Sequence, residues 1–393
     1  MTHIVILGAS QAGIRTAHRI LTRAEKAGKA GRVKLTLVSP NTHMYWNLAS
    51  PRGLIPGQLT NEELFQPIAP GLKRYTDSEV KFVVGRAESL DFDSKTVTVS
   101  SASGNERLGY DILVLATGSS TKADVVFKGS GSTEAVKDAV HAFQARVGKA
   151  KSIVVAGAGP TGVEFAGELA FVYGKEKKVT LLASKTVVFD EAPAHVSKIA
   201  LKLLQDLNIS IKLQARVTGT NELPDGRQEI TLSDGETLIA DMYVPAYGLV
   251  PNTSYVPARY MDARGYVVVD EYLKVKGAEN AWAIGDVTDM EPSQLIYADQ
   301  QSSYVAEAII SVLNNKHSAP YEINPTRMRF HFPPYRMLGC SIGRNAGVGF
   351  QGTMELPPAL ILQHRKHLFA EFLVPAVDGS LYESEVGQKR VVL

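Results

Sequence analysis

Residues 152–162 read SIVVAGAGPTG, an apolar run followed by a complete Gly-x-Gly-x-x-Gly turn. In such a strand–turn–helix unit, Gly157 permits the tight bend, Gly159 lets the backbone approach a pyrophosphate, and Gly162 lets the helix pack closely on the strand. The phosphate then lies at the helix N-terminus, where free amides and about half a positive charge face it. The segment therefore predicts a dinucleotide-binding unit.

A second turn of this kind lies at the N-terminus. Residues 4–7 read IVIL and lead into GASQAG, in which Gly8 and Gly13 keep the outer glycines and Ser10 replaces the middle one. Serine is small, and its hydroxyl could donate a hydrogen bond to a phosphate. Two such turns in one chain predict two dinucleotide sites, one for a tightly bound cofactor and one for an exchanging cofactor.

Strands alternate with helices around both turns, which is typical of parallel sheets in an α/β architecture. Helices are expected from the first turn to about Lys26 and over 297–314. From residue 325 onward the pattern changes, because 327–332 alternates like an antiparallel strand and 343–352 holds four glycines. The expected strands are 4–7, 33–38, 110–116, 152–156, 179–182, 242–244 and 282–284, with a hairpin over 80–99.

These patterns predict an α/β fold with two Rossmann-like dinucleotide-binding domains and a smaller α+β C-terminal domain. The first domain is expected to be discontinuous, with residues 1–122 and 253–324. Residues 123–252 form the second domain in this division, and residues 325–393 form the third.

Composition excludes several classes of function. The chain has 42 Lys and Arg against 40 Asp and Glu, so it lacks the strongly basic character of a nucleic-acid-binding domain. No apolar run reaches the ~20 residues of a transmembrane anchor, and a cytoplasmic location is expected. The single cysteine, Cys340, rules out an intramolecular disulfide or a CxxC redox centre. The electron carrier must therefore be a bound cofactor. No metal site is expected, because the histidines show no metal-ligand spacing.

Three further motifs resemble those of the glutathione-reductase superfamily, in the order of that superfamily. Residues 116–118 (Ala116, Thr117, Gly118) resemble the strand end that flanks bound FAD, and residues 248–252, which begin with Gly248, resemble the segment that closes the NAD(P)H domain. Residues 283–286 resemble the second FAD motif, in which the aspartate, here Asp286, accepts a hydrogen bond from the ribityl chain. The resemblance implies FAD in the first domain and NADPH or NADH in the second.

Within that superfamily the chain most resembles the apoptosis-inducing-factor-like flavoproteins, in particular the ferroptosis-suppressor subgroup of NAD(P)H:quinone oxidoreductases. Residues 47–52 (NLASPR) and 341–349 (SIGRNAGVG) carry this likeness. The cofactor-binding residues that it implies are Gly8, Ser10, Gly13, Asn47, Arg52, Ala87, Ala116, Thr117, Gly118, Gly157, Gly159, Gly162, Lys185, Gly248 and Asp286.

Two departures from the family pattern concern the adenosine ends of the cofactors. Ser39 ends the second strand, where an acidic residue commonly holds the FAD ribose. Ala183 follows the strand at 179–182, where NAD-specific enzymes usually place a carboxylate. Without that carboxylate a 2′-phosphate is not repelled, and Lys185 could pair with it. The sequence thus favours NADPH or dual use, unless Lys185 is only a solvated surface lysine.

Two charged side chains are expected to act on the chemistry. Glu164 lies in the first turn after Gly162, and its equivalent in the resembled family faces the nicotinamide–flavin junction; the alternative is that it only complements the helix dipole. Lys366, or its neighbour Arg365, falls where the resembled family has a lysine near the flavin face used by the quinone. It could stabilise a developing oxyanion, or the basic cluster could be a solvated face. His43, Tyr45 and Trp46 could line the flavin pocket or pack in the core.

The leading hypothesis is an enzyme that passes hydride from NAD(P)H to FAD and then electrons to a small-molecule acceptor such as a quinone. A flavin-dependent tailoring oxidase or reductase of a biosynthetic pathway is the main alternative. A redox-gated signalling flavoprotein and a peripheral membrane dehydrogenase, which would touch the membrane through 359–372, also remain open. Monooxygenases are disfavoured, since no Phe-x-Gly-x-x-x-His fingerprint lies between the two turns.

Overall fold

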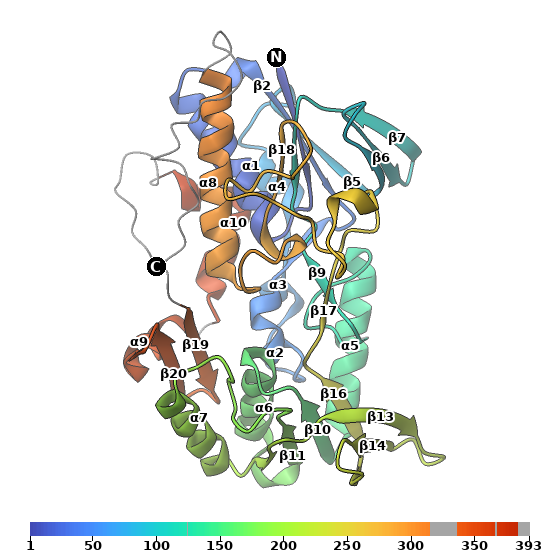
Figure 1. The fold of residues 1–393 in the computed structure, drawn as a ribbon, viewed down its shortest axis with the longest axis vertical. Helices are drawn as coiled ribbons and strands as arrows, with labels where there is room; N and C mark the ends of the chain where they lie inside the picture. Colours follow the sequence, from blue (N-terminus) through green and yellow to red (C-terminus); the bar gives the residue numbers. More distant parts are fainter. Residues whose placement is uncertain (124, 315–335, 366–367, 384–393) are drawn as a thin grey trace.

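The computed structural model describes residues 1–123, 125–314, 336–365 and 368–383 (Figure 1). The strand expected at 327–332 and Lys366 lie outside these ranges. The described chain forms a mixed α/β architecture with separate sheets in its upper and lower halves, which confirms the predicted fold class.

The upper half is built on a seven-stranded sheet with the order β18-β8-β1-β2-β5-β6-β7. The β1–β2, β1–β8, β2–β5 and β8–β18 pairs are parallel, whereas β5–β6 and β6–β7 are antiparallel. The hairpin expected at 80–99 is confirmed and gains a third strand, β7. The strands are β1 Thr2–Leu7, β2 Val33–Ser39, β5 Val80–Asp91, β6 Thr96–Ser101, β7 Gly104–Gly109, β8 Ile112–Leu115 and β18 Ala281–Ala283.

Helices α1 (Gln11–Lys26) and α8 (Leu295–Asn314) pack side by side against this sheet (Figure 1). The residues 4–7 of β1 are almost completely buried, because a central parallel strand is covered on both faces. Smaller elements, including the two-stranded β3–β4 sheet, continue the upper half towards the lower one. They are β3 His43–Tyr45, α2 Ser50–Gly53, α3 Asn61–Leu64, β4 Phe65–Pro67 and α4 Ile68–Leu72.

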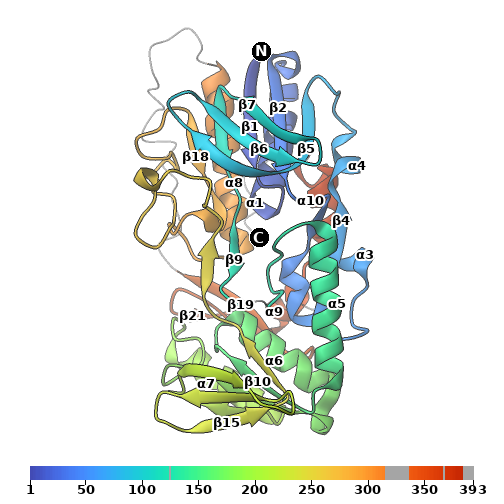
Figure 2. The same cartoon turned by 90° about the vertical axis from the view of Figure 1, so that its right-hand side faces the viewer.

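The lower half holds a four-stranded parallel sheet with the order β12-β11-β10-β16, and a three-stranded antiparallel sheet, β13-β14-β15, lies beside it (Figure 2). Helices α5 (Thr133–Lys149), α6 (Pro160–Tyr173) and α7 (Ala194–Asp206) belong to this half. The strands are β10 Ser152–Ala156, β11 Lys178–Leu182, β12 Ser210–Lys212, β13 Val217–Glu222, β14 Gln228–Leu232, β15 Thr237–Ala240 and β16 Met242–Pro245.

The chain crosses between the halves through β9 (Ser119–Thr121) and β17 (Leu249–Pro251), which pair antiparallel. These crossings lie beside the domain boundaries predicted at residues 122 and 252; the division itself stays a prediction. Each glycine-rich turn follows a central strand of its sheet, β1 above and β10 below. Parallel strands of one sheet direct their carboxyl ends to the same edge, where ligands bind.

The C-terminal segment packs against both halves. A three-stranded antiparallel sheet, β19 (Met337–Ile342), β20 (Ala346–Gln351) and β21 (Met354–Glu355), lies on α6 and α7. Helix α9 (Pro358–Arg365) covers this sheet, whereas α10 (Leu373–Asp378) packs on α4 and α1 above. Within the described residues, no helix combines the length and apolarity needed to cross a bilayer.

Candidate active site

A cavity of about 2160 Å³ reaches both glycine-rich turns. We call residues 8–13 the first cradle and residues 157–162 the second cradle. Gly8, Ser10 and Gln11 of the first cradle and Gly159 and Thr161 of the second line this cavity, as does Glu164. The C-terminal segment closes part of the space with apolar side chains, namely Leu338, Phe350, Leu356, Leu360, Ile361, Phe369 and Phe372.

In the first cradle, close backbone approaches require the two outer glycines. Gly8 has a φ of +105°, and a Cβ there would lie 2.2 Å from the carbonyl oxygen of Ala116. A Cβ on Gly13 would lie 1.7 Å from the Gly8 oxygen. Ser10 is the N-cap of α1, but its side chain makes no capping hydrogen bond. This hydroxyl, which faces the cavity, fits the predicted contact with a phosphate.

Two buried polar atoms beside the first cradle fit a bound cofactor. Among the described residues, Gln11 Nε2 and Asn47 Oδ1 are buried without a hydrogen-bond partner, and both residues line the cavity. An unpaired buried polar atom is costly, at roughly 1–3 kcal/mol, unless a ligand or water satisfies it. Asn47 is a predicted cofactor contact, and its placement agrees with that prediction.

Most of the other predicted flavin residues also line the cavity: Ala87, Ala116, Thr117, Gly118 and Asp286. Asp286 Oδ2 accepts a hydrogen bond from Ser119 Oγ at 2.9 Å and forms an ion pair with Lys128. Lys128 and Ser119 are cavity residues that the sequence analysis missed. Lys128 is one lysine in a Gly- and Ser-rich loop, and the sequence carries no signal that its chain segment meets Asp286.

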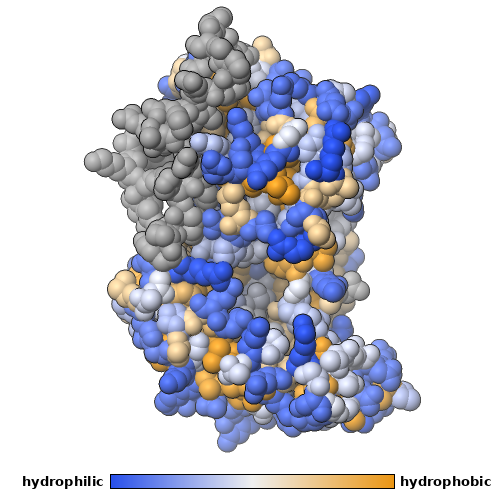
Figure 3. Space-filling model, in the orientation of Figure 1, coloured by the Kyte–Doolittle hydropathy of each residue, from blue (hydrophilic) through white to orange (hydrophobic). Residues whose placement is uncertain are grey.

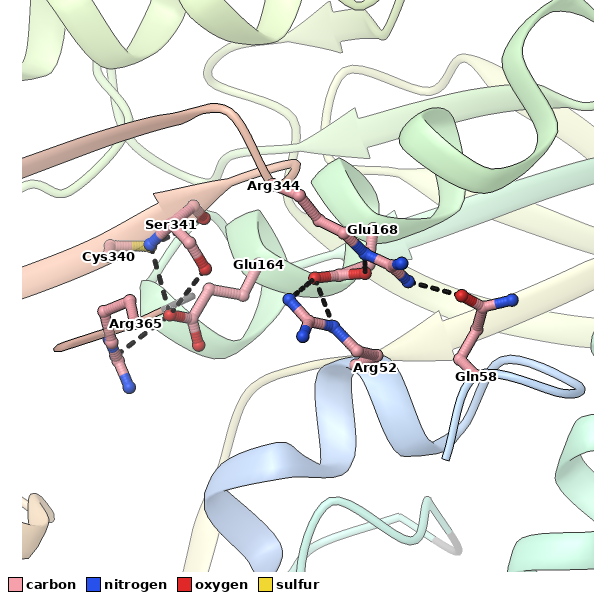
Figure 4. Close-up of polar contacts among 8 residues, drawn as sticks. All are labelled: Arg52, Gln58, Glu164, Glu168, Cys340, Ser341, Arg344 and Arg365. Carbon is pink, nitrogen blue, oxygen red and sulfur yellow. Dashed lines mark hydrogen bonds and ion pairs between the residues drawn. The ribbon is translucent and has the colours of Figure 1, made fainter. Parts of the chain in front are cut away.

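Arg52 lies differently from the position that the family resemblance implies. Its Nε and Nη2 donate to Glu168 Oε1 at 2.9 and 2.6 Å, and Arg52 is not among the residues that line the cavity (Figure 4). The structure therefore gives this guanidinium a buried protein partner on α6. A direct contact between Arg52 and the flavin stays a prediction.

The second cradle repeats the backbone geometry of the first. Gly157 has a φ of +112°, and a Cβ there would lie 2.7 Å from the carbonyl oxygen of Ala246. A Cβ on Gly162 would lie 1.9 Å from the Gly157 oxygen, whereas Gly159, the N-cap of α6, has open space around it. Gly248 lines the cavity opposite this turn.

The adenosine end of the second cradle matches the sequence pattern only in part. Ala183 is buried directly after β11, so no carboxylate projects there. Lys185 is exposed and does not line the cavity. Its proposed contact with a 2′-phosphate stays a prediction.

Glu164 is the buried acid of the site (Figure 4). Arg365 Nη2 on α9 forms an ion pair with Glu164 Oε1 at 2.9 Å, and the backbone amide of Ser341 on β19 donates to the same oxygen at 3.3 Å. Burial raises the pKa of Glu164, although the charge of Arg365 and the Ser341 amide oppose this shift. The site thus holds a carboxyl group that can exchange a proton at higher pH than an exposed glutamate.

Of the basic cluster at 364–367, the structure places Arg365 at this acid. Its Nε also donates to the Gly339 carbonyl oxygen at 2.9 Å, which fixes the side chain between β19 and α6. Cys340 is buried beside it, and burial raises the pKa of its thiol, which stays protonated. No local pattern predicts the contact of Ser341 with Glu164, because it depends on long-range packing of β19 on α6.

The aromatic residues before Asn47 divide between the two alternatives. His43 and Tyr45 line the cavity. Trp46 is fully buried and donates Nε1 to the Leu368 carbonyl oxygen at 2.9 Å, which makes it a packing residue. The first turn of α8 also faces the cavity and could stabilise negative charge there through its helix dipole. In the described part of the chain, no cluster of His, Cys, Asp and Glu could hold a metal ion.

Comparison with known proteins places this geometry in a family. Residues 2–302 match the pyridine nucleotide-disulphide oxidoreductase model. The chain is 46% identical to oxidoreductase ptaL of Pestalotiopsis fici over 97% of its own length and 100% of that protein, and 26% identical to human ferroptosis suppressor protein 1, covering 88% of each.

Among solved structures, the sulfide:quinone oxidoreductase of Aquifex aeolicus has a similar fold, with a TM-score of 0.74 at 19% identity, over 96% of this chain and 92% of that one. The extent of the family match and the 46% identity over nearly the whole chain agree with the two cradles found in the structure. The chain therefore belongs to the pyridine nucleotide-disulphide oxidoreductase family and is an NAD(P)H-dependent flavin oxidoreductase.

Proposed function

We propose that this enzyme binds FAD in the first cradle and NADPH or NADH in the second, and that it passes electrons to a small apolar acceptor of the quinone type. The observation that carries the proposal is the single cavity that both cradles and Glu164 line. Two cofactors bound in one such space can approach each other without a mobile carrier. Cys340, the only cysteine of the chain, cannot form the redox disulfide used by other branches of the family.

The surroundings of the first cradle support a resident FAD. Gln11 and Asn47 offer buried polar atoms, and Asp286 offers a carboxylate that fits the ribityl contact implied by its motif. When bound, the flavin would supply the electron transfer between nicotinamide and acceptor, while the protein supplies placement and electrostatics. Ala183 at the end of β11, where no carboxylate would repel a 2′-phosphate, supports NADPH as donor.

Glu164 and Arg365 support acid–base and charge roles at the cavity wall. The raised pKa of Glu164 lets its carboxyl group hold a proton to higher pH than an exposed glutamate would, and release it to an acceptor that gains electrons. Arg365 orients that carboxyl group and adds a positive charge, which stabilises an oxyanion developing nearby. Placement of an acceptor within hydrogen-bond reach of Glu164 is part of this proposal.

The apolar wall of the cavity supports a flat, apolar acceptor. Phe350, Ile361, Phe369 and Phe372 from the C-terminal segment form this wall with neighbouring leucines. One neighbour in fold is named as a quinone oxidoreductase, which agrees with such a wall. The same wall would accept an aromatic biosynthetic intermediate, so a tailoring oxidoreductase is the second candidate. The proposal includes membership of the ferroptosis-suppressor subgroup, which the 26% identity supports. It also includes a cytoplasmic location.

The alternative of a membrane-surface dehydrogenase receives less support. On the face seen in Figure 3, hydrophilic side chains predominate and the coloured apolar residues form small separate patches. Among the described side chains of α9 and α10, Leu360, at 40% exposed, and Val374, at 50%, are the exposed large apolar residues. Two such residues form no broad apolar face for a bilayer.

The test of the proposed function is anaerobic reduction of the purified protein by NADPH and, separately, by NADH. We expect a yellow protein whose visible absorbance is bleached by a nicotinamide donor and restored by a menadione-like quinone over many turnovers. A protein that binds no flavin would contradict the proposal. One that is reduced once and then holds its electrons in the presence of quinones would point to a signalling flavoprotein instead.

A further inference from the structure

Helix α6 carries a second buried carboxylate one turn beyond Glu164. Glu168 is 1% exposed and, at the i+4 position, lies on the same face of the helix. Unlike Glu164, Glu168 does not line the cavity. A buried carboxylate away from the reacting space needs its own explanation, because an uncompensated buried charge is strongly destabilising.

Two arginines from different parts of the chain meet at Glu168 (Figure 4). Arg52 on α2 donates Nε and Nη2 to Oε1 at 2.9 and 2.6 Å. Arg344, in the turn between β19 and β20, donates Nε to Oε2 at 3.2 Å and also donates to Gln58 Oε1. We call Arg52, Gln58, Glu168 and Arg344 the arginine clamp. It connects the upper half, α6 and the hairpin of β19 and β20 at one point. We call β19, β20 and the turn between them the C-terminal hairpin.

The same hairpin supplies the partners of Glu164. Ser341 lies three residues before Arg344, and its backbone amide donates to Glu164. The hairpin lies unusually close to α6 here: a Cβ on Gly167 would lie 2.7 Å from the backbone nitrogen of Gly343. Arg365, which pairs with Glu164, is itself held by the Gly339 carbonyl oxygen of β19. A shift of the hairpin along α6 would therefore displace both partners of Glu164.

We propose that Glu168 and Arg344 are positioning residues, which seat the C-terminal hairpin on α6 through the arginine clamp and thereby hold Ser341 and Arg365 against Glu164. This role rests on the proposed function, because it matters for turnover only if Glu164 faces the reacting cofactors. Displacements of about 1 Å far from the chemistry can lower a rate by about 100-fold. The clamp is suited to prevent such displacements, since guanidinium–carboxylate contacts fix direction as well as distance.

Arg344 is the better site for the test, because replacement of the fully buried Glu168 could unfold the protein. Arg344 is 29% exposed, so Arg344→Met should leave the chain folded, which thermal melting would verify. Arg344→Lys keeps the positive charge but not the guanidinium that reaches both Glu168 and Gln58. Arg259→Met is the matched control, since it breaks an exposed ion pair with Asp93 far from the clamp.

The rate at which Cys340 reacts with a thiol reagent measures how firmly the C-terminal hairpin packs on α6. Cys340 is the only cysteine of the chain, it lies on β19, and its side chain is buried. Reaction with a thiol reagent requires the hairpin to move away from α6. Loss of a hydrogen bond to a charged group should increase the labelling rate of R344M by about tenfold or more. R344K should lie between R344M and wild type, and R259M should match wild type.

The second measurement is the rate at which a menadione-like quinone reoxidises the reduced flavin of the flavin-loaded protein in a single turnover, because Glu164 is proposed to give its proton to the acceptor. We expect R344M to lower the limiting rate by roughly 10- to 100-fold, with the nucleotide KM and the flavin content unchanged and with partial rescue in R344K. Wild-type rates in R344M would overturn the role, whatever the labelling shows. A slow R344M with wild-type labelling would overturn it too, because hairpin seating would not be the cause.

Failure of the proposed function gives a different result. A wild-type protein that bound no flavin would contradict both the proposed function and the positioning role. A wild-type protein reduced normally by NADPH, beside an unaffected R344M, would overturn only the positioning role.

Discussion

The two cradles share a backbone and differ in their surroundings. Gly8 and Gly157 have φ values of +105° and +112°, and in each cradle the third glycine lies close to the oxygen of the first. Around the first cradle, Ser39 is 4% exposed, and Asn47, Lys128 and Asp286 offer polar side chains to the cavity. Opposite the second cradle, Tyr247 is 49% exposed.

The glycine motif and the residence time of the ligand therefore have separate causes. The glycines create a phosphate site at a helix N-terminus in both halves. Buried polar partners then decide whether the ligand stays, because its departure would leave Gln11 Nε2 and Asn47 Oδ1 without hydrogen bonds. A cradle without such buried partners loses fewer hydrogen bonds when its ligand departs. The first cradle should therefore hold a resident cofactor, and the second should exchange its nucleotide.

Substitution of Gly8 should have the strongest effect, and it should impair the first cradle alone. Gly8→Ala would place a Cβ 2.2 Å from the Ala116 oxygen at a positive φ. Backbone strain of about 1–3 kcal/mol corresponds to flavin binding weakened about 5- to 150-fold, and the overlap adds to it. Visible absorbance of the purified variant measures this loss. Gly31→Ala, where a Cβ meets no atom within 4 Å, should keep full flavin content; a fully yellow G8A would refute the expectation.

The corresponding substitution in the second cradle should weaken binding of the nicotinamide nucleotide and leave flavin binding unchanged. Gly157→Ala would place a Cβ 2.7 Å from the Ala246 oxygen, a smaller overlap than at Gly8. We expect the flavin to remain and the KM for the nicotinamide nucleotide to rise roughly 5- to 30-fold, for a cost of about 1–2 kcal/mol. Steady-state kinetics check this. A variant that loses flavin while it keeps its KM would reverse the assignment of the cradles.

A third prediction concerns Glu164, which lies in the wall of the cavity that both cradles share. The charge of Arg365 lowers the pKa of Glu164 against the effect of burial, so Arg365→Met should raise that pKa further. The carboxyl group would then stay neutral to higher pH, and the pH profile of acceptor reduction should move to higher pH. Its maximum should fall roughly tenfold with the loss of the positive charge. Arg365→Lys should restore most of the profile, and an unchanged profile in R365M would count against the pairing.

The smallest effect concerns the exposed end of the second cradle. Lys185→Met should raise the KM for NADPH about two- to fivefold, in keeping with the ~0.2–1 kcal/mol of an exposed charge pair. The KM for NADH should not change, because NADH lacks the 2′-phosphate. Lys202→Met on α7 is a control with a similarly exposed lysine. Equal changes for NADPH and NADH would exclude a phosphate contact at Lys185.

The sequence predicted the features that depend on local pattern. Buried parallel strands, the two glycine turns and the helices that follow them all read directly from residues close in the chain. Pairings between distant segments were not accessible in the same way. Lys128 meets Asp286 across 158 residues, and Ser341 meets Glu164 across 177. Such contacts depend on how whole elements pack, and no spacing rule reports them.

Arg52 has a partner that the family resemblance does not report. Its motif implies a flavin contact, which stays a prediction, and the structure pairs it with Glu168 on α6. A buried guanidinium takes a carboxylate that packing brings within reach, and the sequence around residue 52 does not say that Glu168 lies there. Of the basic cluster at 364–367, Arg365 has a described side chain, and the packing of α9 on β19 places it at Glu164. The role predicted for Lys366 stays a prediction.

The most direct test of the difference between the cradles is repeated ultrafiltration of the wild-type protein loaded with flavin and NADP⁺. We expect the flavin absorbance to stay with the protein while the nicotinamide nucleotide passes into the filtrate within the first washes. Flavin that washes out as readily as NADP⁺ would contradict a resident site in the first cradle and an exchanging site in the second.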